Sequence, residues 1–145
     1  MQKLNQTFFY TLEKSIRLYR HYCQDQFKQH GFQITLDQWI TLNMLVEFPE
    51  ASQMEIAQKV FKDKASITRI IELLVRDDYL LRNKNTADFR KSRFTLTKKG
   101  EETVSKINEL IVQIRTSALE GLPENEVRSV MHFIQKLENN CVASF

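Results

Sequence analysis

Apolar residues recur at spacings of three and four along most of this chain, which is the period of an amphipathic helix. Capping and helix-breaking residues divide the pattern into six stretches. The first is longer than the usual globular helix, so we expect another subunit to cover it. We expect helices from Leu4 to His30, from Thr35 to about Glu47, from Ser52 to about Val60, from Asp63 to about Asp77, from Thr97 or Lys98 to the residues before Gly121, and onward from Pro123.

Two of these helices begin with the same short motif. Thr35 precedes Gln38 by three residues, and Ser52 precedes Glu55 by the same spacing. In such a capping box the hydroxyl accepts a hydrogen bond from the third helical N–H, and the longer side chain accepts one from the N–H of the capping residue. Gly31 follows the first helix, where a left-handed C-terminal cap is expected.

The period changes in the middle of the chain. Residues 79–82 and 92–96 are extended in character, and the second stretch alternates apolar and polar residues. A polar loop of nine residues, 83–91, joins them, so we expect a β-hairpin. Three glycines and two prolines in 145 residues disfavour all-β and parallel α/β folds, which need more turn residues. The sequence therefore predicts a mainly α fold with one small β-hairpin.

Positive charge is concentrated in the same middle third. Residues 59–99 contain twelve Lys and Arg against five Asp and Glu, a net charge of +7, whereas the whole chain carries +3. The remaining residues therefore sum to −4. A basic segment between acidic ones indicates either a polyanionic partner such as nucleic acid or a loop that Lys and Arg simply solubilise, and the charge alone does not decide between them.

Other classes of protein are disfavoured by what the sequence lacks. There is no run of 18 apolar residues, and the first residues do not form a secretory signal. Cys23 and Cys141 make neither a disulfide framework nor a zinc cluster, so we expect a reducing, cytoplasmic location. The histidines show no ligand spacing, and no phosphate loop or nucleophile–base pair is recognisable. We expect no metal, no cofactor and no catalysis.

The third and fourth helices have the spacing of a helix-turn-helix, in which the second helix enters the major groove of DNA. At 100° per residue, Ile67, Ile70, Ile71 and Leu74 point inward, and Ala65, Arg69, Glu72 and Arg76 point outward. Ser66 and Thr68 lie on the flanks, where small and hydroxylated residues allow a close approach to base edges. Arg69 lies one turn into the helix and can reach a guanine or a phosphate.

The hairpin provides a second candidate contact with DNA. Arg90 lies near its tip and can enter a narrow minor groove, where the negative potential is high. Asp88, two residues earlier, can orient Arg90; as an ordinary turn residue it would only be solvated. We expect phosphate contacts from Lys62, Lys64, Lys91, Arg93 and the start of the third helix at Ser52 and Gln53.

Together these residues resemble the MarR family of winged-helix transcription regulators, over nearly the whole chain. Three local features carry the resemblance: the run Lys64–Arg69 that opens the fourth helix, Asp88-x-Arg90 in the hairpin, and Leu96–Gly100 before the fifth helix. One departure is Asp78, where the family usually has glycine. Aspartate tolerates a positive φ better than most residues, so we expect a modest strain and no change of fold.

The resemblance implies a winged helix-turn-helix lobe for binding DNA at residues 33–100, and a helical dimerisation lobe formed by residues 1–32 and 101–145. Ser66, Thr68 and Arg69 match major-groove positions, Arg90 matches the minor-groove arginine, and Asp88 matches the residue that braces the wing. The family generally binds pseudo-palindromic duplex DNA as a homodimer. Its members are often repressors released by small aromatic or anionic ligands, or by thiol oxidation.

The sensing element is less well defined by the sequence. Tyr10, Tyr19, Tyr22, Trp39 and Met44 are candidates for an effector pocket, although aromatic residues at helical spacing are more often core.

Two alternatives to a ligand-responsive regulator remain open. In one, Cys23 acts as a redox trigger, although the peroxide-sensing relatives carry their cysteine nearer the start of this helix, where this chain has Thr11. A cysteine on an apolar stripe is more often a small buried hydrophobe. In the other, the winged helix is a protein–protein adaptor that does not bind DNA.

Overall fold

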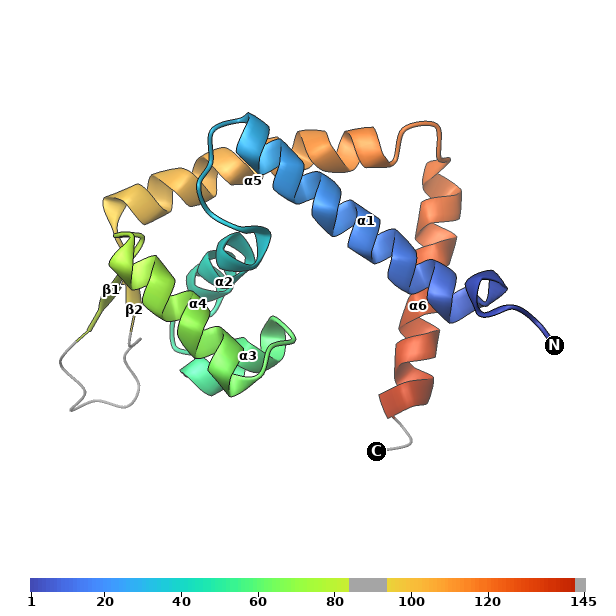
Figure 1. Cartoon of the computed structure of the whole chain (residues 1–145), viewed down its shortest axis with the longest axis horizontal. Coiled ribbons are helices and arrows are strands. Elements are labelled where there is room, and N and C mark those ends of the chain that lie inside the picture. Colours follow the sequence, from blue (N-terminus) through green and yellow to red (C-terminus); the bar gives the residue numbers. More distant parts are fainter. Residues whose placement is uncertain (84–93, 143–145) are drawn as a thin grey trace. The chain divides into compact units, whose positions relative to one another are not determined.

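The structure is a computed structural model, and it describes residues 1–83 and 94–142. The chain divides into two compact units, Met1–Ile114 and Arg115–Phe145. Figure 1 shows the order of the elements along the chain. They are a 3-10 turn η1 (Leu4–Gln6), α1 (Phe8–Gln29), α2 (Leu36–Glu47), α3 (Gln53–Lys59), α4 (Lys64–Arg76), β1 (Leu80–Arg82), β2 (Phe94–Leu96), α5 (Lys98–Ala118) and α6 (Glu124–Val142).

The predicted fold class is confirmed. Helices dominate, and β1 and β2 form a two-stranded antiparallel sheet in the part of the chain that the structure describes. The register pairs Leu80 with Leu96, Leu81 with Thr95 and Arg82 with Phe94.

One hydrophobic core occupies the first unit and joins α1, α2, α3, α4, the hairpin and the first part of α5. Phe27 from α1 packs edge-on against Trp39 from α2, with ring centroids 6.0 Å apart. The indole N–H of Trp39 donates to Oδ1 of Asn108 on α5 at 2.9 Å, which satisfies its only polar group. The largest fully buried side chains are Phe27, Ile34, Leu42, Ile56, Ile67, Ile71, Leu74, Leu80, Ile107 and Ile114.

The predicted helix ends are largely confirmed, with one correction at the start of the chain. Both capping boxes form, at Thr35 with Gln38 and at Ser52 with Glu55. Asp78 adopts a positive φ of 63°, as expected at the position where the family usually has glycine. The first long helix does not begin at Leu4, because the side chain of Thr7 caps a new helix at Phe8.

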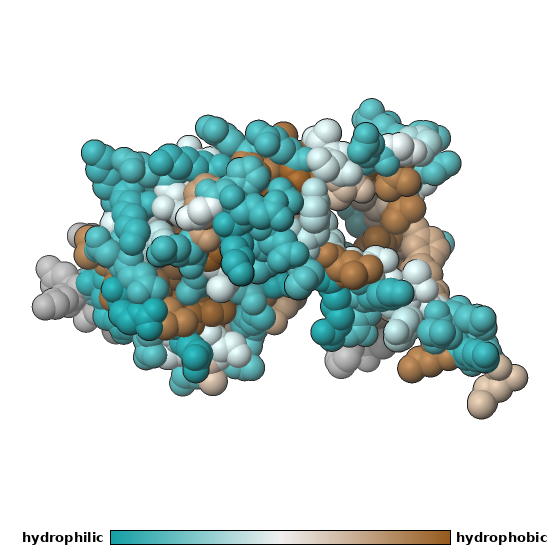
Figure 2. All heavy atoms as spheres, turned by 45° about the horizontal axis from the view of Figure 1, so that its top comes forward, coloured by the Kyte–Doolittle hydropathy of each residue, from teal (hydrophilic) through white to brown (hydrophobic). Residues whose placement is uncertain are grey.

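Helix α6 in the second unit contains no buried residue. Val130 and Met131 are each more than half exposed, and Figure 2 shows hydrophobic residues in brown among the hydrophilic ones at the surface. The apolar stripe predicted for this helix is therefore present but uncovered within one chain. Among the described residues, no helix is both long enough and apolar enough to cross a membrane.

Candidate nucleic-acid interface

Helices α3 and α4 form the predicted helix-turn-helix, and local hydrogen bonds fix its turn. Phe61 takes a left-handed φ of 59°, which reverses the chain after α3. The N–H of Lys62 then donates to the carbonyl of Ala57 at 2.9 Å. The carboxylate of Asp63 caps α4 by accepting a hydrogen bond from the N–H of Ser66 at 2.7 Å. The hydrogen bonds with Ser66 lower the pKa of this carboxyl. The turn and the cap thus fix the residue at which α4 begins.

The two faces of α4 lie as the periodicity predicts. Ile67, Ile71 and Leu74 are fully buried, and Ile70 is half-buried. The opposite face is exposed and consists of Ala65, Arg69, Glu72 and Arg76, with Ser66 and Thr68 half-buried at its edges. The residues of the exposed row of α4 can therefore contact a ligand while the opposite face of the helix stays packed in the core.

Not every Lys and Arg side chain counted in the sequence of this face is free of an ion pair within the protein. Arg76 forms an ion pair with the adjacent Asp77, at 2.9 Å between Nε and Oδ1. Arg69 and Lys64 are exposed, and neither forms an ion pair with another residue in the ranges 1–83 and 94–142. Both can therefore turn toward an anion without breaking an existing ion pair.

Gln53 and Thr68, two of the predicted DNA contacts, bind each other. The amide nitrogen of Gln53 donates to Oγ1 of Thr68 at 2.7 Å, and this hydroxyl donates to the carbonyl of Lys64 at 2.7 Å. A hydroxyl has one proton, so in this arrangement Thr68 cannot also donate to a phosphate or a base. It can accept one further hydrogen bond or present its methyl group. The sequence offers no sign of this pairing, because the partners lie 15 residues apart.

Lys62, another predicted phosphate contact, is half-buried beside an acidic residue. Its ammonium lies 3.0 Å from Oδ2 of Asp37 at the start of α2, and Arg20 of α1 hydrogen-bonds to Oδ1 of the same carboxylate. Burial raises the pKa of Asp37, but the hydrogen bonds and charges of Lys62 and Arg20 outweigh it, and the net pKa lies below its ordinary value. Lys62 must leave this carboxylate before it can contact DNA.

Side-chain contacts of Thr97 and Lys99, which the sequence did not reveal, join the root of the hairpin to the start of α5. The hydroxyl of Thr97 donates to the carbonyl of Asp78 at 2.6 Å, and its oxygen accepts from the N–H of Gly100. The ammonium of Lys99 donates to the carbonyl of Asp77 at 2.8 Å and lies 4.3 Å from the ring centroid of Tyr79. The Leu96–Gly100 motif is thus explained by the way it anchors the wing. Thr97, Lys99 and Gly100, in this order, were the feature of the sequence that could have indicated the anchor.

The candidate residues Asp88, Arg90, Lys91 and Arg93 lie outside the described residues. Their roles stay predictions from the sequence.

The five aromatic and methionine residues suggested for an effector pocket do not come together in one cavity. Trp39 is in the core, and Tyr19 and Met44 pack against it half-buried. Tyr10 and Tyr22 are exposed on α1, and Tyr10 borders a shallow hollow formed by α1 alone.

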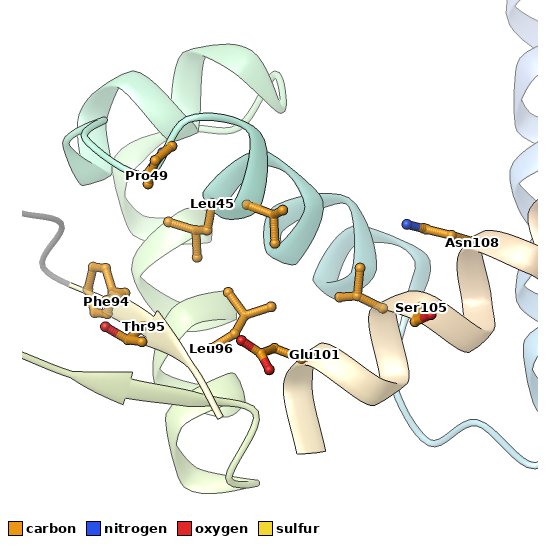
Figure 3. A pocket seen from close by; sticks show the side chains of 10 residues that line it. Leu45, Pro49, Phe94, Thr95, Leu96, Glu101, Ser105 and Asn108 are labelled. Atoms are coloured by element: carbon orange, nitrogen blue, oxygen red, sulfur yellow. The ribbon is translucent and has the colours of Figure 1, made fainter. Parts of the chain in front are cut away.

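A larger cavity of about 480 Å³ lies between the C-terminal half of α2, β2 and the first turns of α5. None of the five suggested residues lines it (Figure 3). Its walls are Leu45, Val46, Pro49, Phe94, Thr95, Leu96, Glu101, Val104, Ser105 and Asn108.

The two cysteines differ in their surroundings. Cys23 is completely buried in the core, which is the placement expected for a small apolar residue, whereas Cys141 is exposed on α6. Buried thiols are the least accessible to oxidants, so nothing in this placement favours a redox role for Cys23. Within residues 1–83 and 94–142, no group of three or more His, Cys, Asp and Glu residues could hold a metal ion.

An exposed polar recognition helix, a capped turn before it and an anchored hairpin after it define a winged-helix protein. The family model described as MarR family matches residues 31–90, which contain α2, α3, α4 and β1. Residues 31–90 thus match the MarR family, and the chain shares the winged-helix fold of solved MarR-type structures.

Solved structures of other bacterial proteins share this fold at low sequence identity. Bordetella bronchiseptica BpsR, whose DNA binding is regulated by 6-hydroxynicotinic acid, is 21% identical, with a TM-score of 0.81 over 95% of this chain and 97% of that one. Staphylococcus aureus MepR in complex with DNA is 18% identical, with a TM-score of 0.80 over 96% and 99%. The apo form of Escherichia coli MarR is 17% identical, with a TM-score of 0.72 over 90% and 96%.

Proposed function

We propose that this chain is a sequence-specific regulator that binds a pseudo-palindromic operator in duplex DNA as a homodimer, acts as a repressor and responds to a small effector. The observation that carries the proposal is the exposed face of α4, where Arg69 stands without an ion-pair partner among the described residues, in a segment of net charge +7. MepR, which has the same fold, is known in complex with DNA.

In the proposed complex, residues 33–100 form the lobe that binds DNA, and residues 1–32 and 101–145 form the dimerisation lobe. Two α4 helices enter successive major grooves about 34–36 Å apart. Ala65, Ser66, Thr68 and Arg69 face the base edges, with Arg69 as the main donor. Arg90 enters the minor groove and Asp88 braces it, while Ser52, Gln53, Lys64, Lys91 and Arg93 contact phosphates.

The contacts within the protein refine two of these roles. Thr68 acts on DNA through its methyl group or as an acceptor, because its hydroxyl proton is already donated to Lys64. Lys62 contributes less than Lys64, because a phosphate must compete with Asp37 for its ammonium. We infer both roles from the hydrogen bonds and ion pairs that Thr68 and Lys62 form within the protein.

A small effector is the second part of the proposed function. BpsR responds to 6-hydroxynicotinic acid, a small aromatic acid, which supports an effector for this chain. Tyr10, Tyr19, Tyr22, Trp39 and Met44 do not form a common cavity in one protomer, so any pocket that they line requires the partner subunit as well.

Selection of binding sites from random duplexes, followed by affinity measurements with variants, tests the proposal. Arg69→Ala should cost about 1–3 kcal/mol and relax specificity at one position of the site. Lys64→Ala should weaken binding to all sequences and reduce the salt slope by about 1. Thr68→Val should change the affinity much less than Arg69→Ala. Arg17→Ala, on α1 and paired with Glu13, is the control. No enriched site and a flat salt dependence would favour the adaptor alternative instead.

A further inference from the structure

The residues that line the cavity between α2, β2 and α5 favour a ligand of one sign of charge over the other. Six of its ten lining residues are apolar: Leu45, Val46, Pro49, Phe94, Leu96 and Val104. The other four are Thr95, Glu101, Ser105 and Asn108, so among the described residues the one charged group on the wall is a carboxylate. A volume of about 480 Å³ lies within the range of sites for small organic ligands.

The two lysines at the start of α5 are held by other groups. The ammonium of Lys98 lies 4.0 Å from a carboxylate oxygen of Glu102, and that of Lys99 is hydrogen-bonded to the backbone of Asp77. The guanidinium of Arg82 lies 5.6 Å from the ring centroid of Phe94, but Arg82 is not a wall residue. Among the residues that the structure describes, an anionic ligand would therefore meet Glu101 without a cation on the wall to hold it, whereas a cationic ligand would meet its counter-charge.

The polar groups on α5 are arranged in one row. Glu101, Ser105 and Asn108 are four and three residues apart, which places them on the same helix face. Figure 3 shows these side chains on the cavity side of α5. Glu101 and Asn108 are separated by seven residues, or about 10 Å along the helix axis.

The amide of Asn108 has a defined orientation. Its oxygen accepts from the indole N–H of Trp39, which can only donate, so its NH2 group is left to donate to a ligand. The cavity thus offers the negatively charged carboxylate of Glu101 at one end and the NH2 donor of Asn108 at the other. Phe94 of β2 adds an aromatic wall.

We propose that this cavity binds an amphipathic organic cation: a flat aromatic body with an ammonium group paired with Glu101. This differs from the small aromatic acids suggested by the family resemblance. Because Phe94, Thr95 and Leu96 belong to the wing strand, a bound ligand contacts β2, α2 and α5 at once. That such a ligand acts as an effector rests on the proposed DNA-binding function, but its binding to the protein does not.

The test uses the full-length chain without DNA and two probes that share a ring system. The cation is 9-(aminomethyl)anthracene and the anion is 9-anthracenecarboxylate, with affinities measured by fluorescence titration at pH 7. We expect the cation to bind at least tenfold more tightly than the anion. Glu101→Gln should weaken cation binding about tenfold, because it removes a charge-assisted contact, and should leave anion binding equal or stronger.

Two further variants separate this site from others. Glu102→Gln removes the same charge from the next residue of α5, which is not a wall residue, and should leave both affinities unchanged. Val46→Trp should fill the cavity and abolish binding of the cation. Thermal unfolding of each variant checks that it folds.

Equal binding of the two probes, or equal losses in Glu101→Gln and Glu102→Gln, would overturn the proposal. A failure of Arg69→Ala to alter DNA binding would overturn the proposed function and leave this ligand site standing.

Discussion

Helices α4 and α6 are both amphipathic, yet only one of them has its apolar face covered within the chain. In α4, Ile67, Ile71 and Leu74 are at most 1% exposed. In α6, Val130 and Met131 are 55% and 57% exposed. The same sequence pattern therefore has two outcomes: in the first unit the apolar face packs near α2, α3 and β1, and in the second it is exposed.

The difference separates two kinds of stability. The packing around α4 is a property of a single protomer, and mutations there change its free energy of unfolding. In the proposed homodimer the partner covers the apolar face of α6, so mutations there should change the fraction of dimer and depend on protein concentration. This comparison also explains why we propose that α6 belongs to the dimerisation lobe.

The largest expected effect comes from deleting a buried side chain of α4. Ile71→Ala should lower the free energy of unfolding by about 2–5 kcal/mol, because it removes apolar contacts and leaves a cavity in a closed core. Urea denaturation followed by circular dichroism measures it. The adjacent exposed change Glu72→Ala should stay within about 0.5 kcal/mol. If the two variants were equally stable, the face of α4 would not be packed as described.

A charge on the uncovered face of α6 should disrupt association and leave the fold intact. Val130→Asp places a carboxylate in the proposed dimer interface, so we expect dimer affinity to fall about 100-fold or more, while the far-ultraviolet spectrum is unchanged. Sedimentation velocity over a range of concentrations measures it. Asn139→Asp adds the same charge away from the apolar stripe and should have little effect. Dimers of undiminished affinity in Val130→Asp would place the interface elsewhere.

The features that depend on neighbouring residues could be predicted from the sequence. The capping boxes at Thr35 and Ser52, the cap at Asp63 and the positive φ of Asp78 are each determined by residues within one turn. The buried and exposed faces of α4 followed from its period alone. The start of the first helix was missed because the apolar stripe continues to Leu4, and the period does not reveal that Thr7 is the cap.

The features that depend on distant residues could not be predicted. Gln53 and Thr68 are both polar residues near helix starts, and nothing in their spacing indicates that they hydrogen-bond to each other. The ion pair of Lys62 with Asp37 has the same cause, since the partners are 25 residues apart and meet only after α2 and α4 pack. Charge counting thus identified the basic region correctly but overestimated how many of its cations are free.

Gly100 tests how tightly the wing is joined to α5. It lies in a helix, where alanine would normally stabilise by about 1 kcal/mol, but a Cβ there would be 2.3 Å from the carbonyl oxygen of Tyr79. Since that oxygen belongs to the backbone, we expect Gly100→Ala to destabilise the chain by about 1–3 kcal/mol.

Gly31→Ala is the control for this position. Its site is open, and the only cost is a φ of +80°, so about 1 kcal/mol is expected. Urea denaturation of both variants compares them. A stabilised Gly100→Ala would show that the wing root can move away from α5.

The smallest effect concerns Asp37, which links α1 and α2 to the turn before α4. Its pKa is lower in the folded state than in the unfolded chain, so its carboxylate stabilises the fold above the unfolded pKa of about 4. This stabilisation is lost as the pH falls through the folded pKa. Because the side chain is one-third exposed, we expect Asp37→Asn to cost only about 1 kcal/mol at pH 7.

At pH 3 the difference between Asp37→Asn and the parent chain should shrink, because the parent's Asp37 carboxylate then becomes increasingly protonated and, like asparagine, uncharged. Urea denaturation at the two pH values measures it, with the exposed Glu50→Gln as the control. A difference that is the same at pH 7 and pH 3 would show that the loss comes from packing. If Asp37→Asn also strengthens DNA binding at moderate salt and increases the salt slope, Lys62 has been released to contact a phosphate. The same carboxylate would then limit DNA affinity while it joins α1 to the DNA-binding lobe.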